Sequence, residues 1–143
     1  MLKGISPIIS PELMYTLMSM GHGDEIVFAD ANYPSDSCAE RIVRCDGHRI
    51  TDLLEAILPL FPLDQYVDQP VALMEKVPGD PAEVTIWDTY REIFNKHQPL
   101  KKDFEFVERF AFYERSKDAY AIVATGETAL YSNVLLKKGV ISP

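Results

Sequence analysis

The densest group of polar side chains able to do chemistry lies early in the chain, in the run Gly21-His22-Gly23-Asp24-Glu25, and Asp30 follows it closely. Histidine is the side chain best suited to give and take protons near neutral pH. The glycines on either side of His22 remove bulk, so a ligand can approach the ring. We therefore expect His22 to act as an acid–base group. The alternative is that the glycines only form a helix-to-strand turn and that His22 faces water.

Further polar residues in the second half of the chain have the chemistry to hold a ligand rich in hydroxyl groups. Tyr131 and Asn133 are two apart in a segment with strand character, so we expect both side chains on one face. A phenol beside a carboxamide offers hydrogen-bond donors and acceptors together. Arg109 opens an aromatic cluster and adds a cationic donor. The plainer alternatives are an exposed polar strand face and, for Arg109, a surface ion pair with Glu108 or Glu105.

Two other kinds of site are not supported by the spacing around His22. Asp24 and Glu25 carry oxygen ligands that could join His22 on a divalent metal, but no His-x-x-x-His or Cys-x-x-Cys pair accompanies them. We therefore expect no metal site. The pair Gly21-x-Gly23 lacks the third glycine of a dinucleotide fingerprint and precedes a strand instead of following one. We therefore expect no phosphate cradle there.

The elements around His22 are predicted by local signals. Ser10 is a good N-cap and Pro11 suits the first helical position, so a helix begins there, and we expect Gly21 to end it in the left-handed conformation. The apolar run 25–29 fits a buried strand. Asp30 then lies at the carboxyl end of that strand, where open α/β sheets bind their ligands.

Helical and strand-like segments alternate along the rest of the chain. Strands are predicted at residues 41–45, 71–77, 104–107, 119–124 and 131–136. Helices are predicted from Thr51 and over residues 83–97, with a loop at 78–81, and the segment 109–115 fits either a helix or a strand. This alternation predicts an α/β layered sheet with helices on both faces.

The composition limits the class of protein. A length of 143 residues suits one domain, which we expect to span residues 1–143. The 22 acidic and 14 basic side chains give a net charge of -8, which argues against nucleic acid or an anionic membrane as partner. No run approaches the roughly 18 apolar residues of a membrane span. We expect Cys38 and Cys45 to be reduced thiols in a cytoplasmic protein, serving as core filler rather than as nucleophiles.

Four irregular motifs together resemble one known family. They are Ile5-Ser6-Pro7 with Ser10-Pro11-Glu12-Leu13, the string Met20-Gly21-His22-Gly23-Asp24-Glu25, the run Arg109-Phe110-Ala111-Phe112-Tyr113-Glu114-Arg115 and the tail Leu135-Leu136-Lys137-Lys138-Gly139-Val140. From residue 2 to residue 140 the chain resembles the fucose mutarotase branch of the RbsD/FucU family. The ribose pyranase branch shares the His-x-Asp region and the Tyr-x-Asn tail, and the aromatic run points to the fucose branch.

The resemblance implies a fold, an activity and an assembly. The fold would be a three-layer α/β/α sandwich around a mixed sheet, and the family suggests a helix for the segment 109–115. The activity would be the interconversion of the α and β anomers of L-fucose, without a cofactor. The family forms homo-oligomers, often decamers of two pentameric rings, with sites near subunit contacts.

The resemblance also assigns residues. His22 matches the family's proton donor, Asp30 a sugar-binding carboxylate and Arg109 a substrate-contacting cation, and a sugar-binding stretch matches Tyr131, Ser132 and Asn133. Ring opening needs a second proton carrier, for which the sequence leaves Tyr131, Asp30 and a bound water open. Two alternatives remain for the function. One is ribose pyranase-type activity on D-ribose, and the other is a non-catalytic monosaccharide-binding or transport-accessory protein.

Overall fold

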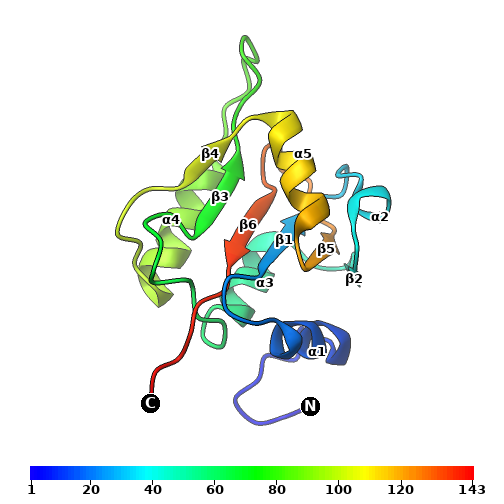
Figure 1. Cartoon of the computed structure of the whole chain (residues 1–143). Coiled ribbons are helices and arrows are strands. Elements are labelled where there is room, and N and C mark those ends of the chain that lie inside the picture. The colour runs from blue at the N-terminus through cyan, green and yellow to red at the C-terminus, as the bar shows by residue number, and fades with distance from the viewer.

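Five helices and six strands make up the computed structural model, which describes residues 1–143; they alternate along the chain until the last two strands, which follow one another directly (Figure 1). The strands are β1 (Glu25–Ala29), β2 (Ile42–Cys45), β3 (Val71–Met74), β4 (Glu105–Val107), β5 (Ala121–Thr125) and β6 (Val134–Lys137). The helices are α1 (Pro11–Ser19), α2 (Ser35–Cys38), α3 (Ile50–Ile57), α4 (Ile86–His97) and α5 (Arg109–Asp118). None of the helices has the length and apolar character needed to cross a membrane.

The strands form one mixed sheet in the order β2-β5-β1-β6-β3-β4. β6 runs antiparallel to both of its neighbours, β1 and β3, and the other pairs are parallel. Every residue of β3 and β5 is buried, which is typical of strands covered on both faces. The sequence prediction of short, continuously apolar strands is thereby confirmed.

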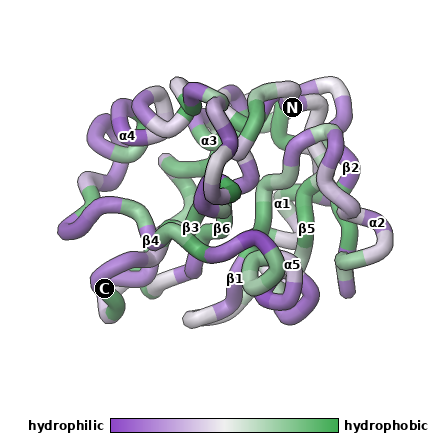
Figure 2. The backbone as a smooth tube through the Cα atoms, turned by 90° about the horizontal axis from the view of Figure 1, so that it is seen from above, coloured by the Kyte–Doolittle hydropathy of each residue, from purple (hydrophilic) through white to green (hydrophobic).

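Helices cover both faces of this sheet, as expected from the alternating pattern. Seen from above, α3 and α4 lie on one side of the strands and α5 lies on the other (Figure 2). Along β1, Ile26 and Phe28 join the larger core cluster with α1, α3 and α4, whereas Val27 and Ala29 join a smaller cluster with Phe112 of α5. Successive side chains of a strand point to opposite faces, so β1 contributes to both cores. The three-layer α/β/α expectation is confirmed.

Helix α1 begins as predicted but ends differently. The Ser10 hydroxyl accepts a hydrogen bond from the N–H of Leu13 at 3.1 Å, and Pro11 follows it. The helix ends at Ser19 and the chain then becomes extended at Met20, so the expected left-handed stop at Gly21 is wrong. The left-handed residue is Gly23, with φ of 87°, and it belongs to the turn into β1.

The aromatic segment that fitted either structure is a helix, as the family resemblance suggested. The carboxylate of Glu108 caps α5 by accepting hydrogen bonds from the N–H groups of Phe110 and Ala111, both at 3.0 Å. This cap satisfies backbone donors that would otherwise be free at the helix start. It also fixes Arg109 at the first position of the helix.

Several predicted boundaries are wrong; the helix predicted over 83–97, for example, starts only at Ile86. Helix α3 starts at Ile50 after Arg49, so Thr51 lies within it and does not cap it. β3 stops at Met74, and the predicted loop at 78–81 belongs to a longer irregular connection that reaches α4. β6 starts at Val134, so Tyr131 and Asn133 precede the strand instead of lying in it.

Candidate functional site

A cavity of about 210 Å³ lies at the carboxyl end of β1 and contains four of the predicted site residues. Asp30 follows the end of β1 and Asn133 precedes the start of β6. Because these two strands pair antiparallel, the end of β1 lies beside the start of β6, and the two residues are neighbours. Arg109 enters from the start of α5, and Tyr131 comes from the segment before β6. The other lining residues are Asn32, Tyr33, Met74, Val77, Asp80, Tyr113 and Leu130. In Figure 1 the cavity lies at the upper end of the sheet, where the β3–α4 connection projects beyond α5.

A hydrogen bond from the backbone of Asp30 to the side chain of Asn133 holds these two residues together. The N–H of Asp30 donates to the Asn133 Oδ1 at 2.7 Å, which leaves the Asn133 amide nitrogen as its available donor. One carboxylate oxygen of Asp30 accepts from the N–H of Asn32 at 2.9 Å. Burial raises the pKa of Asp30 above its usual value, and the nearby Glu127 carboxylate acts in the same direction. The pair presents an acceptor and a donor side by side.

The backbone of the segment from Tyr131 to Asn133 is held by hydrogen bonds from helix α4. The Trp87 Nε1–H donates to the Tyr131 carbonyl at 2.8 Å, and the Tyr90 hydroxyl donates to the Ser132 carbonyl at 2.6 Å. Tyr131 itself has φ of 55°, a left-handed conformation that is uncommon for a non-glycine residue. Such strained backbone persists where the surrounding structure holds it, and it is frequent at functional sites.

Ser132 does not reach the cavity with its side chain. It is fully buried, and its hydroxyl donates to the Ala129 carbonyl at 2.7 Å. Only the neighbours on either side, Tyr131 and Asn133, line the cavity. The predicted three-residue stretch therefore divides into two lining residues and a central residue that anchors them.

Arg109 makes no ion pair with either glutamate considered from the sequence. Its Nε–H donates to the Tyr113 hydroxyl at 3.3 Å, and its guanidinium lies 5.4 Å from the centre of the Phe110 ring. Glu108 is used as the cap of α5, and Glu105 pairs with Arg115 at 2.9 Å. The surface ion-pair alternative is wrong, and the guanidinium keeps free N–H donors at the cavity.

Among the lining residues that the sequence did not indicate, three carry a hydroxyl or a carboxylate: Tyr33, Tyr113 and Asp80. Tyr33 and Tyr113 stand with their rings 5.4 Å apart, and the Tyr33 hydroxyl donates to the buried Ser116 hydroxyl at 2.6 Å. Asp80 accepts a hydrogen bond from the Tyr131 hydroxyl. The loop around Asp80 was recognised from its prolines and glycine, but no sequence signal placed it beside a tyrosine so far along the chain.

His22 lies at the amino end of β1, whereas the other predicted site residues lie at its carboxyl end. It precedes the start of β1, whereas Asp30 follows its end, and a strand of this length spans roughly 16 Å. Its neighbours are instead Asp64, whose carboxylate is 3.1 Å from the Nε2, and Tyr66, whose ring centre is 5.4 Å from the imidazole. Asp30 therefore does not contact the His22 of its own chain.

Asp64 is the partner of His22 that the sequence did not indicate. Burial alone would raise its carboxyl pKa, but the Tyr66 N–H and the His22 ring outweigh it and hold that pKa below its usual value. A carboxylate only accepts hydrogen bonds, so the Nε2 must be the donor. The Nδ1 is then the nitrogen of His22 that can exchange a proton with a ligand.

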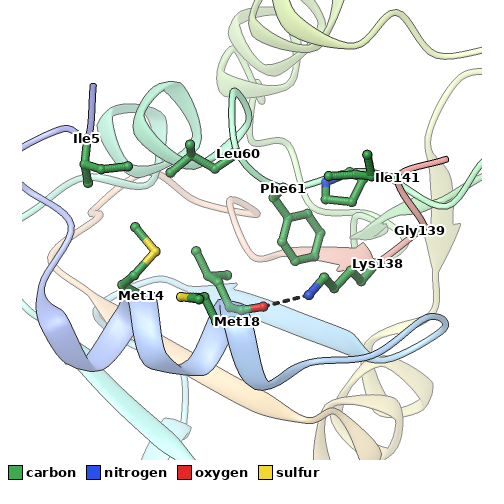
Figure 3. A pocket seen from close by; sticks show the side chains of 10 residues that line it. Ile5, Met14, Met18, Leu60, Phe61, Lys138, Gly139 and Ile141 are labelled. Atoms are coloured by element: carbon green, nitrogen blue, oxygen red, sulfur yellow. Dashed lines mark hydrogen bonds between the residues drawn. The ribbon is translucent and has the colours of Figure 1, made fainter. Parts of the chain in front are cut away.

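A second, larger cavity of about 350 Å³ is mainly apolar (Figure 3). It lies between α1 and the C-terminal segment, and Met14, Met18, Leu60 and Ile141 are among the residues that line it. The Lys138 ammonium is engaged by the carbonyls of Leu17 and Met20 at 2.8 and 2.6 Å. Without a free acid or base among its lining residues, this cavity is not suited to proton transfer.

Comparison with known proteins gives one consistent family. The model of the RbsD / FucU transport protein family matches residues 3–141. A fucose mutarotase of Danio rerio is 54% identical, over 99% of this chain and 95% of the relative. An L-fucose mutarotase of Glaesserella parasuis is 51% identical, over 98% of this chain and 96% of the relative.

A solved structure gives the same result in three dimensions. The fucose mutarotase of Streptococcus pneumoniae, whose crystal structure is a complex with L-fucose, superposes with a TM-score of 0.94. It is 57% identical in sequence, and the match covers 99% of this chain and 100% of that one.

Proposed function

The chain belongs to the RbsD/FucU family, and on that basis we propose that it is an L-fucose mutarotase, an isomerase that interconverts the α and β anomers of L-fucose. The observation that carries the proposal is the cavity at the carboxyl end of β1. There Asp30, Arg109 and Asn133 converge on a space of monosaccharide size. The 57% identity to a fucose mutarotase in complex with L-fucose supports the choice of sugar.

Mutarotation opens the sugar ring and closes it on the other face of the C1 aldehyde. Opening delivers a proton to the ring oxygen and removes one from the anomeric hydroxyl, and closing reverses both transfers. The reaction therefore needs positioned hydroxyl groups and two proton carriers, with no redox change. General acid–base catalysis of about 10² to 10⁴ per group is adequate for such a step.

The cavity residues divide these tasks. The Arg109 guanidinium and the Asn133 amide nitrogen donate to sugar hydroxyls, and the Asp30 carboxylate accepts from one. Met74, Val77 and Leu130 offer apolar surface to the methyl group of a 6-deoxy sugar. The aromatic rings of Tyr33 and Tyr113 cover the apolar side of the sugar ring.

In this proposal the proton donor is His22 of a second copy of the chain. Within one chain β1 separates His22 from the cavity by roughly 16 Å, too far for a direct proton transfer. Exposed apolar side chains lie at both places: Met18 and Ile141 line the apolar cavity beside α1, and Leu130 lines the cavity that holds Asp30. Apolar surface of this kind marks contact between proteins. A repeated head-to-tail contact forms a ring when its rotation closes, and the family's decamers of two pentameric rings are the assembly we propose.

The test is NMR exchange spectroscopy on equilibrated L-fucose with and without the protein. We expect faster exchange between the α and β anomers, and loss of that acceleration in His22→Ala. D-ribose, run alongside, measures pyranase-type activity. Binding of L-fucose with unchanged exchange would replace the proposal with a non-catalytic sugar-binding protein.

The unpaired Cys38 and Cys45 support a cytoplasmic location, which fractionation of the source cells tests.

A further inference from the structure

The β3–α4 connection places one carboxylate on the cavity in a fixed orientation. The Asp80 N–H donates to the Val77 carbonyl at 3.1 Å and closes a turn, with Pro78 and Gly79 at its centre. Gly79 has φ of 86°, the conformation that the third residue of a type II turn requires. One carboxylate oxygen of Asp80 accepts from the Ala82 N–H at 2.9 Å. The other oxygen is left for a partner outside the loop.

That partner is the hydroxyl of Tyr131. The hydroxyl donates its proton to Asp80 and accepts a hydrogen bond from the Val77 N–H at 3.2 Å. A phenol has one proton and two acceptor positions. With the proton given to Asp80 and one acceptor position used by Val77, the remaining acceptor position is available to a ligand in the cavity that Tyr131 lines. Tyr131 therefore meets a sugar hydroxyl as an acceptor and not as a donor.

From this geometry we propose that Asp80 is a positioning residue of the proposed mutarotase, which turns the Tyr131 oxygen toward the anomeric hydroxyl and takes up the tyrosine proton when that hydroxyl gives up its own. The inference rests on the proposed function and names the second proton carrier of that reaction as the Tyr131–Asp80 pair. Asp80 acts through Tyr131 and need not contact the sugar.

The step balances in protons and bonds. The O–H bond of the anomeric hydroxyl breaks and its proton forms a new O–H bond on Tyr131, while the original tyrosine proton passes to the Asp80 carboxylate. The electron pair left on the anomeric oxygen forms the C1 carbonyl, and the bond between C1 and the ring oxygen breaks. The ring oxygen takes a proton from the acid, His22 of a second copy in the proposed function. Ring closure on either face returns each proton, so no other reactant is needed.

The protonation states of the pair fit this role. The hydrogen bonds from Tyr131 and the Ala82 N–H hold the pKa of Asp80 below its usual value, so it is a carboxylate at neutral pH. The hydrogen bond to Asp80 raises the pKa of Tyr131, so its hydroxyl keeps its proton until another arrives. Asp80 lies on the same cavity as Asp30, but Asp30 has no such tyrosine.

The decisive variant is Asp80→Asn. An asparagine at position 80 keeps one acceptor oxygen for the Ala82 N–H that holds the turn. Its NH2 group then faces the Tyr131 hydroxyl and can neither accept from it nor take up a proton. We expect kcat for L-fucose exchange to fall by roughly 10²-fold while the affinity for L-fucose, measured by titration calorimetry, changes less than about threefold. Asp80→Glu restores part of the rate. The matched control is Asp103→Asn, which removes a surface carboxylate paired with Arg91 and leaves kcat unchanged.

A double-variant comparison shows whether Asp80 acts through Tyr131. In a Tyr131→Phe background, Asp80→Asn should cause no further loss of kcat, because the pair acts as a unit. Labelling tyrosine with ¹³C at Cζ adds a readout independent of activity, in which Asp80→Asn lowers the pKa of Tyr131. An unchanged kcat in Asp80→Asn, or equal losses of kcat and affinity, overturns the inference while the function stands. A wild-type protein that binds L-fucose without accelerating exchange overturns both.

Discussion

At the scale of single residues, the His22 ring depends on Asp64 for its orientation. The buried carboxylate lies 3.1 Å from the Nε2 and receives the Tyr66 N–H as well, at 3.0 Å. It therefore fixes which ring nitrogen is free. Without this partner the imidazole can rotate and adopt the other tautomer, so a proton on Nδ1 is no longer held in one direction.

We predict that Asp64→Asn lowers the rate of L-fucose exchange by about 10- to 100-fold, because an amide can turn its NH2 group toward the Nε2 and hold the ring in the other tautomer. NMR exchange at saturating L-fucose measures the rate. The chain offers a matched control in Glu55→Gln, since the Glu55 carboxylate bonds the His97 ring at 2.7 Å on the α3–α4 side. Equal losses in both variants would show a general effect on stability instead of an effect on His22.

Asp30 is the residue whose charge conflicts with its surroundings. Because burial raises its pKa in the folded chain, the folded state binds a proton more readily than the unfolded state between the two pKa values. The free energy of unfolding that Asp30 contributes is therefore present below its unfolded pKa and is lost as the pH rises through the folded value.

We predict that Asp30→Asn raises the thermal midpoint at pH 7 and removes this part of the pH dependence. The asparagine oxygen can still accept from the Asn32 N–H, so the turn after β1 is kept. The same change should slow L-fucose exchange by at least about 10²-fold, because the carboxylate acceptor is gone. Thermal unfolding from pH 4 to pH 7 checks the first effect, and a lower midpoint at pH 7 would contradict it.

At the scale of elements, helix α4 reaches past the sheet to hold the segment that lines the cavity. The Tyr90 hydroxyl is fully buried and donates to the Ser132 carbonyl at 2.6 Å. We predict that Tyr90→Phe lowers the free energy of unfolding by about 1 to 3 kcal/mol, because it leaves that carbonyl without its donor. Urea unfolding measures the loss.

The comparison variant for this prediction is Tyr15→Phe, which removes a hydroxyl from the exposed surface of α1. It should change the free energy of unfolding by less than about 0.5 kcal/mol. Tyr90→Phe should also lower L-fucose affinity, since the strained Tyr131 loses part of its support. A Tyr90→Phe protein as stable as Tyr15→Phe would refute the anchoring role of α4.

The elements that could be predicted are those whose signals are local. Ser10 and Pro11 mark the start of α1, and the apolar run of β1 placed Asp30 at the end of a strand. The start of β6 was wrong because Tyr131 and Asn133 continue the alternating pattern of the strand. The left-handed Tyr131 is imposed by bonds from α4 and the β3–α4 connection, and contacts so distant in sequence leave no local pattern.

The candidate site was predicted in part for the same reason. Asp30, Arg109 and Asn133 carry polar groups beside recognisable elements, so their types alone indicated a site, and the structure brings them together. Asp64 and Asp80 are hydrogen-bonded to partners 42 and 51 residues away, His22 and Tyr131. Only the folded chain shows such pairs.

At the scale of the whole molecule, the acidic balance of 22 against 14 does not describe the proposed substrate. A neutral sugar is not steered by a net charge of -8, so binding must come from the local groups in the cavity. What the whole molecule decides is where those groups meet. His22 and the cavity lie at opposite ends of β1, so a single copy presents half of the proposed site at each end of that strand.

This division leads to a prediction that two inactive variants restore each other. His22→Ala keeps an intact cavity, and Arg109→Ala, at an exposed position, keeps an intact His22. If each site combines the cavity of one copy with His22 of the next, a random one-to-one ring contains about a quarter of sites with both parts intact. We therefore expect co-expression of the two variants to recover about a quarter of the wild-type exchange rate.

Two controls show whether the recovered exchange comes from sites shared between copies. Co-expressing two differently tagged His22→Ala chains should give no recovery, because no copy then supplies the histidine. Native mass spectrometry confirms that the two variants share one assembly. A mixed assembly without recovered exchange would mean that the histidine and the cavity of different copies do not meet. A protein that light scattering shows to be a fully active monomer would refute the shared site outright, because roughly 16 Å of β1 separates the two halves in a single copy.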